Sequence, residues 1–170
     1  MRVRVGVVLA GLAGPLAVAA ALLITPTRES GAQGPEQPIA FSHKLHAGEY
    51  RIDCQYCHAD ARRSPYAGIP SVSRCMGCHR IVAADRPEVQ KLQRYLQDGR
   101  AIPWVRVHKV PGFVYFPHKR HVQAGVACQT CHGSVQAMVV LAQVAPLTMG
   151  WCVECHTARR ASLDCVGCHH

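Results

Sequence analysis

Ten cysteines in a chain of 170 residues constrain its fold more than any other feature. All ten fall in five C-x-x-C pairs, and a histidine directly follows each pair. C-x-x-C-H is the attachment signature of c-type haem, in which both thiols bond the haem covalently and the histidine becomes an axial iron ligand. The sequence therefore predicts five covalently bound haem c groups. In chain order, the motifs are motif 1 (Cys54, Cys57, His58), motif 2 (Cys75, Cys78, His79), motif 3 (Cys128, Cys131, His132), motif 4 (Cys152, Cys155, His156) and motif 5 (Cys165, Cys168, His169).

Three other uses of cysteine pairs fit this pattern less well. Zinc sites built from two C-x-x-C pairs each would use four pairs and leave the fifth without a partner. A disulfide framework or a redox-active dithiol does not require a histidine directly after every pair. Because all ten cysteines belong to the motifs, none remains for a structural disulfide.

The composition indicates a core that is not made of side chains alone. Aromatic residues form only 6% of the chain, and much of the 49% hydrophobic content comes from the cysteines and one N-terminal run. The remaining apolar residues are too sparse for the core of an ordinary domain of this size. We therefore expect a haem-cored fold that is mostly irregular, with short α-helices and loops wrapped around the haems.

The positive charge of the chain has an explanation other than nucleic acid. The formal net charge is +9, but five haems bring two propionates each, or about ten negative charges, which lysine and arginine can pair with. No basic run is interleaved with aromatic residues. We therefore expect no nucleic-acid partner.

The N-terminal segment has the pattern of a membrane anchor. Arg2 and Arg4 precede residues 5–24, which contain no charge and are long enough to span a bilayer as one transmembrane helix. The basic start predicts that residues 1–4 stay in the cytoplasm and that a linker (25–40) and the haem region are exported. The alternative is a removed signal peptide with a Ser-Gly-Ala cleavage site at residues 30–32. Either interpretation places the haem region on the periplasmic side of the bacterial inner membrane.

An internal repeat divides the exported part. FSHKLH (residues 41–46, the first block) recurs as FPHKRH (residues 116–121, the second block), each at a similar distance ahead of a haem motif. Such a repeat indicates duplication of a small haem-packing unit. We expect a dihaem lobe over residues 41–80, a connecting region over 81–113 and a trihaem lobe over 114–170.

The connecting region contains the one strong helix pattern. Gly99 is the expected stop, and the following segment through residue 116, which we call the strap, is β-branched and aromatic but interrupted by prolines, so we expect it to be extended without forming a sheet. The helix pattern itself has a capping candidate, a proline suited to the first turn, and an apolar stripe with a tyrosine beside it: Asp85, Pro87, Val89, Leu92, Leu96 and Tyr95.

The two blocks supply candidates for the second axial ligand of each iron. Haem that only carries electrons normally has two axial ligands, and histidine or methionine are the usual choices. Histidines three residues apart lie on one side of a helical turn, and a haem face accepts only one of them, so each pair should serve two haems. The alternative is that they are surface histidines. The predicted distal ligands are His43, His46, His118 and His121.

The fifth distal ligand stays open among several residues. Met149 lies three residues before Cys152, and a thioether ligand would raise the potential of its haem. His108 in the strap is the second candidate, and Met138 and His170 are also available. An iron without a sixth ligand is a further alternative, and it would allow catalysis.

Several quoted stretches together resemble one known family, the pentahaem cytochrome c subunit of alternative complex III. They are FSHKLHAG…IDCQYCH, AGIPSVSRCMGCH, IPWVRVHKVPGFVYFPHKRHVQAGVACQTCHG, LTMGWCVECH and CVGCHH. The resemblance covers roughly residues 38–170 and includes the single N-terminal membrane helix. It implies a class III-like packing of five haems, with the motif histidines and the two block pairs as axial ligands.

The resemblance also implies a function and partners. Alternative complex III is a bacterial quinol oxidoreductase that oxidises menaquinol. Its pentahaem subunit relays electrons from integral quinol-oxidising subunits and an iron–sulfur subunit related to molybdopterin enzymes to a periplasmic acceptor or an oxidase, alongside a monohaem cytochrome. We accordingly expect an electron carrier of the respiratory chain with no catalytic residue or substrate site of its own.

Two other functions remain as alternatives. A stand-alone, membrane-anchored multihaem quinol dehydrogenase cytochrome that feeds a periplasmic reductase would share the anchor and the haem region. A multihaem enzyme acting on nitrite or hydroxylamine would need an iron with an open face, often with an unusual attachment motif, whereas all five motifs here are regular.

Overall fold

The computed structural model describes residues 34–169, which lie within one compact unit, Ala32–His170. Several expectations fall outside the described residues: the cytoplasmic start, the span over residues 5–24, most of the linker, the candidate cleavage site and His170. Among the described residues, no helix combines the length and hydropathy needed to cross a membrane.

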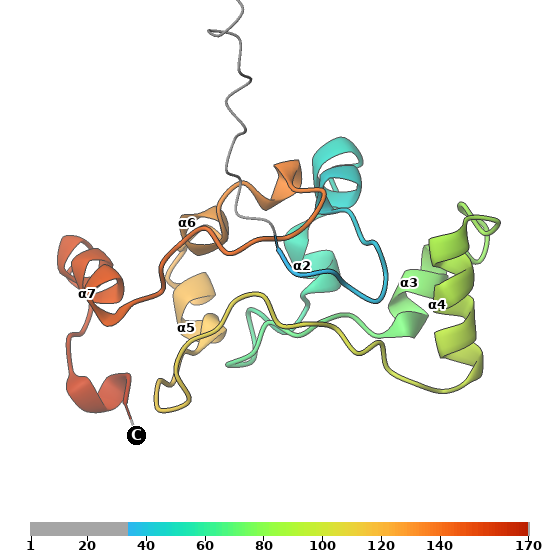
Figure 1. Ribbon diagram of the computed structural model, residues 1–170. Helices are drawn as coiled ribbons and strands as arrows, with labels where there is room; N and C mark the ends of the chain where they lie inside the picture. Colours follow the sequence, from blue (N-terminus) through green and yellow to red (C-terminus); the bar gives the residue numbers. More distant parts are fainter. Residues whose placement is uncertain (1–33, 170) are drawn as a thin grey trace, which may run out of the picture. The chain divides into compact units, whose positions relative to one another are not determined.

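Short helical segments joined by irregular chain form the described region (Figure 1). No β-strand occurs in residues 34–169, and the one β-type pairing there is an isolated antiparallel bridge between Val114 and His169. The expectation of short helices in a mostly irregular fold is confirmed. The helical segments are η1 (Lys44–Glu49, a π-helix), α2 (Cys54–Cys57), α3 (Val72–His79), α4 (Pro87–Gln97), α5 (His118–Gln123), α6 (Gln129–His132), η2 (Val135–Ala137), α7 (Met149–Ala158) and η3 (Cys165–Gly167).

Side-chain packing produces only a small apolar core. Helices α3 and α4 pack on each other, and Cys75, Tyr95 and Trp104 lie partly buried against this cluster. In the described part of the chain, no large side chain is fully buried. A core of this size agrees with the expectation that side chains alone do not fill the interior. Its buried members are Ile39, Val72, Met76, Leu92 and Ile102.

The α4 helix begins and packs differently from the sequence expectation in two respects. Its N-cap is Arg86, whose side chain makes no capping bond, so the prediction of Asp85 as the cap was wrong. Pro87 takes the first turn as expected, because it has no N–H to leave unpaired there. Val89 is buried, but Leu96 is 37% exposed, so the buried stripe is narrower than predicted.

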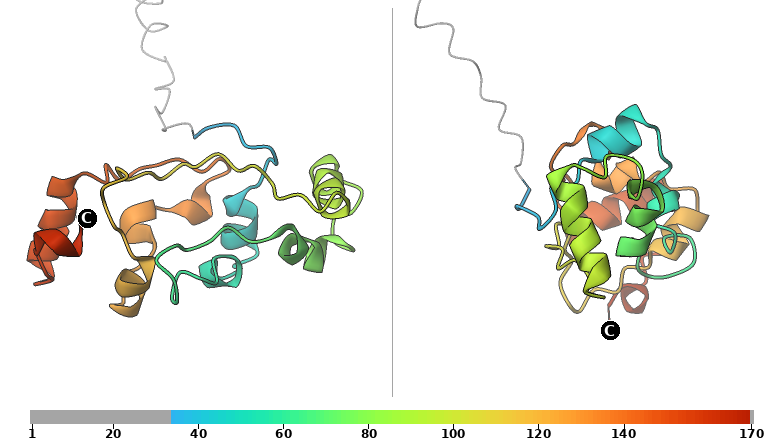
Figure 2. Two further views of the ribbon diagram at one scale, coloured as in Figure 1. Left: turned by 90° about the horizontal axis from the view of Figure 1, so that it is seen from below. Right: turned by 90° about the vertical axis from the view of Figure 1, so that its right-hand side faces the viewer.

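Four helices that carry haem motifs follow one another in space in the order α3, α2, α6, α7, as Figure 1 and the left view of Figure 2 show. This order differs from the order in the chain, because α2 precedes α3. The chain returns past its earlier part through the strap, whose Val105 exchanges two 2.9 Å hydrogen bonds with the side chain of Gln37. We refer to the spatial order α3, α2, α6, α7 as the row.

Backbone hydrogen bonds join the two expected lobes in the middle of the row. The backbone N–H of His118 donates to the carbonyl of Pro65 at 2.9 Å, and Lys119 donates to Ser64 at 3.1 Å. On the other side, Lys44 of η1 donates to Met138, which follows η2, at 2.9 Å. The division into a dihaem and a trihaem lobe stays a prediction from the repeat, and these bonds link the two halves within one unit.

Candidate haem-binding site

The two blocks adopt the same local structure. In the first, the ring of Phe41 lies 4.9 Å from that of His43 and 4.4 Å from that of His46, with interplanar angles of 87° and 26°. In the second, Phe116 lies 4.9 and 4.4 Å from the two histidine rings, at 88° and 30°. The phenylalanine therefore orients both imidazoles of its block, which explains why the residue recurs at the same spacing.

The ring nitrogens of the candidate ligands are arranged for metal binding through Nε2. A carbonyl can only accept, so a histidine Nδ1 that bonds one must carry the proton, which leaves the Nε2 lone pair for iron. Metal-bound histidines usually use their second nitrogen in this way. Six candidate ligands have such a bond, at 2.6–3.0 Å, to a backbone carbonyl: His46 to Ser42, His58 to Gly68, His79 to Val82, His118 to Pro65, His121 to Pro117 and His156 to Ser162.

Three of the block histidines each face the histidine of one motif. Nitrogen–metal distances near 2 Å place the centroids of two rings that ligate one metal from opposite sides roughly 6 Å apart. The observed separations fit this value, so these residues are compatible with a haem iron between each pair. The centroids are 6.0 Å apart for His46 and His79, 6.4 Å for His118 and His132, and 6.0 Å for His121 and His156.

The fourth block histidine, His43, lies near the histidine of motif 1. Burial lowers the pKa of His43 to about 4, and His58 and then His46 contribute smaller effects of the same sign. The Nδ1 atom of His43 is buried and has no hydrogen-bond partner among the described residues. A neutral imidazole close to His58 fits the expected ligand role.

The surroundings of motif 5 differ from those of the other motifs. Among the described residues, the ring of Phe113 lies against that of His169, at 5.8 Å between centroids and 30° between planes. The candidate Met149 begins α7 with 68% of its surface exposed, and Cys152, three residues later, lies close to Cys168 of motif 5. The structure thus brings the helix of Met149, but no block histidine, to motif 5.

The other candidates for the fifth ligand lie elsewhere or outside the described residues. His108 lies beside motif 3, with its ring centroid 4.3 Å from that of His132. Met138 follows η2, where its carbonyl accepts a bond from η1. His170 is not among the described residues.

Thiols of different motifs lie close together in a consistent order. Burial is the largest cause of a raised thiol pKa in each of these cases, and a thiol of another motif adds to it. The electrostatic interactions between thiols link motif 2 with 1, 1 with 3, 3 with 4 and 4 with 5, which matches the row. The pairs are Cys57 with Cys75 and Cys78, Cys54 with Cys128, Cys131 with Cys152 and Cys155, and Cys152 with Cys168.

None of the ten cysteines is paired in a disulfide, so all ten are available for covalent attachment of haem. In residues 34–169, no group of three or more His, Cys, Asp or Glu side chains is placed to hold a bare metal ion. The donor chemistry instead consists of two thiols and one imidazole per motif, with a second imidazole opposite in three cases.

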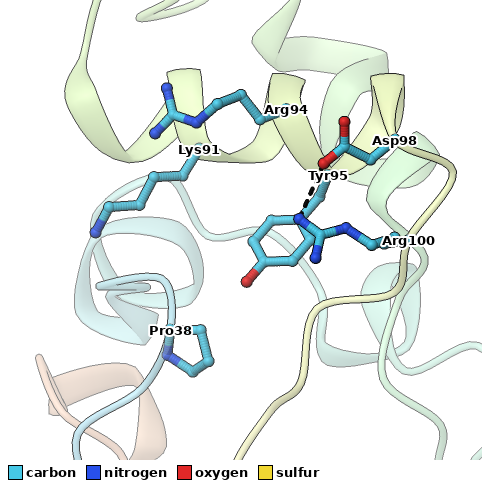
Figure 3. A pocket seen from close by; sticks show the side chains of 6 residues that line it. All are labelled: Pro38, Lys91, Arg94, Tyr95, Asp98 and Arg100. Carbon is cyan, nitrogen blue, oxygen red and sulfur yellow. Dashed lines mark hydrogen bonds and ion pairs between the residues drawn. The ribbon is translucent and has the colours of Figure 1, made fainter.

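A surface pocket of about 310 Å³ lies between α4 and residue 38 (Figure 3). Lys91, Arg94 and Arg100 line it together with Asp98, which pairs with Arg100 at 2.9 Å. The figure shows no cysteine or histidine among the lining side chains. This pocket therefore offers no ligand for iron.

Sequence reasoning missed the backbone acceptors that hold the histidines. A carbonyl is present at every residue, so its position next to an imidazole leaves no signal in the sequence. The close approach of Cys54 to Cys128 was missed for a similar reason, because it depends on how the strap returns the chain. The contact between His108 and His132 had a weak signal, the isolated histidine in the strap.

Two known families match the chain. The class III cytochrome c family matches residues 21–102, and the family described as cytochrome c7 and related cytochrome c matches residues 114–170. The multihaem cytochrome c subunit of a menaquinone reductase from Nitratidesulfovibrio vulgaris is 34% identical over 98 residues, which are 57% of this chain and 46% of that protein. The chain thus spans about half the length of this curated relative.

The comparisons agree with the attachment motifs. Cytochromes c of these families bind haem covalently, as the motifs predict. The chain is thus similar to class III multihaem cytochromes c, and these matches together with the C-x-x-C-H motifs indicate haem c as a cofactor and electron transfer as the class of function.

Proposed function

We propose that this chain is an electron-transfer subunit with five covalently bound haem c groups and no substrate site of its own. The observation that carries the proposal is the set of facing histidine rings with centroids 6.0–6.4 Å apart. Haem c supplies one-electron transfer when it is bound. An imidazole on each side of an iron leaves no coordination position for a substrate.

The proposed ligands follow the structure pair by pair. His46, His118 and His121 are the distal ligands opposite motifs 2, 3 and 4, as their ring separations support. His43 is the distal ligand for motif 1, as its proximity to His58 supports. Met149 stays our prediction for motif 5, because its helix lies next to that motif.

The row of attachment motifs gives the relay its two ends. The order 2, 1, 3, 4, 5 places motif 2 on α3 at one end and motif 5 at η3 at the other. Redox partners would then approach near α3 and near η3, whereas motifs 1 and 3 lie inside the row.

The quoted motifs favour membership of an alternative complex III-type assembly. In that role, the N-terminal segment anchors the chain in the bacterial inner membrane and the haem region faces the periplasm. Its partners are integral quinol-oxidising subunits, an iron–sulfur subunit related to molybdopterin enzymes, a monohaem cytochrome and a soluble acceptor. The chain takes electrons from the iron–sulfur side and passes them to the acceptor.

The similarity to a menaquinone reductase subunit favours a second candidate. A cytochrome of this kind would pass electrons toward quinone, whereas the first candidate passes them away from quinol. Both candidates place the same haem row between a quinone-reactive complex and a periplasmic partner.

Purification from native membranes in mild detergent tests these proposals. We expect five haems per chain by pyridine haemochrome, co-purifying iron–sulfur and multi-helix subunits, and reduction of the haems by menaquinol. Menaquinone-dependent oxidation of pre-reduced haems without reduction by menaquinol would favour the second candidate. Isolation of the chain alone would favour a stand-alone quinol dehydrogenase cytochrome, and carbon monoxide binding by native protein would contradict the closed iron sites.

A further inference from the structure

The histidine of motif 3 differs from those of motifs 1, 2 and 4 in the hydrogen-bond partner of its Nδ1. In motifs 1, 2 and 4, the histidine Nδ1 donates to a backbone carbonyl. The Nδ1 of His132 instead lies 3.2 Å from Nε2 of another side chain, His108. A side-chain partner can be replaced by mutation, whereas a carbonyl partner is present whatever the residue.

The geometry of the two rings defines their protonation. Their centroids are 4.3 Å apart and their planes meet at 76°, so the edge of one ring points toward the other. If His132 bonds iron through Nε2, its Nδ1 carries a proton and donates it, and the Nε2 of His108 must accept. His108 is then the neutral tautomer with its proton on Nδ1.

The strap holds His108 in this position from both sides. Val105 is tied to Gln37 by two hydrogen bonds of 2.9 Å. The backbone N–H of Lys109 donates to Gln143 at 3.5 Å. These bonds lie within three residues of His108, so the imidazole is positioned by the fold and not only by its contact with His132.

We propose that His108 is a positioning residue for the haem of motif 3: it orients His132 and lowers the reduction potential of that haem. The physical basis is that an acceptor on Nδ1 makes an imidazole a stronger donor to its metal, and a stronger donor stabilises the oxidised iron. The proposal rests on the proposed role of His132 as an iron ligand.

The geometry does not fit two other roles for His108, as a distal ligand of motif 5 or of motif 3. As the distal ligand of motif 5, it would have to lie beside His169, but the ring next to His169 is that of Phe113. As the distal ligand of motif 3, it would compete with His118, whose ring faces that of His132 at 6.4 Å and 11° between planes. The contact through Nδ1 lies on the side of His132 away from Nε2.

The test compares His108→Leu, His108→Asn and the control Lys109→Leu, in full-length holo-protein with all haems attached. Potentiometric titration followed by optical and electron paramagnetic resonance spectra resolves individual haems. In His108→Leu, we expect one haem to shift upward so that its oxidised-to-reduced ratio falls at least threefold at fixed ambient potential, about 28 mV at 59 mV per tenfold. His108→Asn retains a carbonyl acceptor, so the potential of this haem should stay close to its wild-type value. Lys109→Leu should leave the potential of every haem unchanged.

Three results would overturn the proposal. The first is that no haem shifts in His108→Leu, and the second is that all haems shift together, as a general loosening of the fold would cause. The third is a high-spin, carbon monoxide-binding haem in His108→Leu, which would make His108 an axial ligand. Failure of the proposed function is distinguishable, because it would already appear in the unmutated protein as a haem count other than five or as open iron sites.

Discussion

The first and second blocks have nearly the same ring geometry but different surroundings. Phe41 and Phe116 each hold two imidazoles at 4.9 and 4.4 Å. The surroundings diverge at the first histidine: His118 donates from Nδ1 to Pro65 at 2.9 Å, whereas Nδ1 of His43 is buried without a partner among the described residues. Six residues of sequence thus specify the local unit, and tertiary contacts specify what lies around it.

Replacing the second histidine of either block should give the largest effect, and the same effect in both blocks. His46→Ala and His121→Ala each remove a proposed distal ligand, so each variant should convert one of five haems to a high-spin form that binds carbon monoxide. Carbon monoxide difference spectra measure the fraction, expected to be about one fifth of total haem. Gln123→Ala, on the same helix as His121, is the control. A variant that binds no carbon monoxide would remove that histidine from the ligand set.

If each block is a unit stabilised by its own contacts, Phe41 and Phe116 should contribute equally to the free energy of unfolding. Phe41→Ala and Phe116→Ala should each lower the free energy of unfolding by about 2 kcal/mol, less than for a fully buried ring because both are half-buried. Denaturation of the holo-protein followed by haem absorbance measures this. Phe113→Ala, at 63% exposure, is the control. A difference of more than about 1 kcal/mol between the blocks would show that surroundings dominate.

Substitution of the fifth residue after the first histidine, Gly48 or Gln123, should change the free energy of unfolding by different amounts in the two blocks. A Cβ on Gly48 would collide with the carbonyl oxygen of Gln136, because η1 and η2 pack closely. Gly48→Ala should therefore destabilise the holo-protein by about 1–2 kcal/mol. The equivalent residue of the second block, Gln123, is exposed and donates one side-chain hydrogen bond, to the Arg62 carbonyl at 3.3 Å, so Gln123→Ala should cost only about 0.5 kcal/mol. Equal losses in the two denaturation curves would contradict this difference.

Loss of the hydrogen bond between Glu88 of α4 and Ala40, the residue before the first block, should have the smallest effect on stability, and this effect should depend on pH. The carboxylate of Glu88 accepts from the Ala40 N–H at 2.7 Å and pairs with Lys91, and these bonds lower its pKa, that of Lys91 most. Glu88→Gln should cost at most about 1 kcal/mol near neutral pH.

The sign of this effect follows from the lowered pKa of Glu88. Its contribution is present above the pKa of an unfolded glutamate and is lost as pH falls through the lower folded value. Wild type and Glu88→Gln should therefore converge in acid when their unfolding free energies are compared, and Glu49→Gln should match wild type throughout. A constant gap at all pH values would mean that the carboxylate charge is not responsible.

The features predictable from the sequence were local. The helical placement of the histidine pairs and the start of α4 at Pro87 follow from spacing and from the chemistry of proline. The cap prediction at Asp85 was wrong, because the helix begins one residue later, with Arg86 as its N-cap. The acceptors at Gly68 and Pro65 could not be predicted, because a carbonyl is common to all residues and only the tertiary fold brings one to an imidazole.

The row also bears on how the molecule could be assembled and lengthened. The motif that is translated first lies inside it, motif 2 is added on one side, and motifs 3, 4 and 5 extend the other side in the order in which they emerge from the ribosome. Among the described motifs, motif 5 adjoins motif 4 alone, so a further unit packed beyond motif 5 would have one neighbour in the row. A row organised in this way can be lengthened at one end while its interior motifs keep the same neighbours.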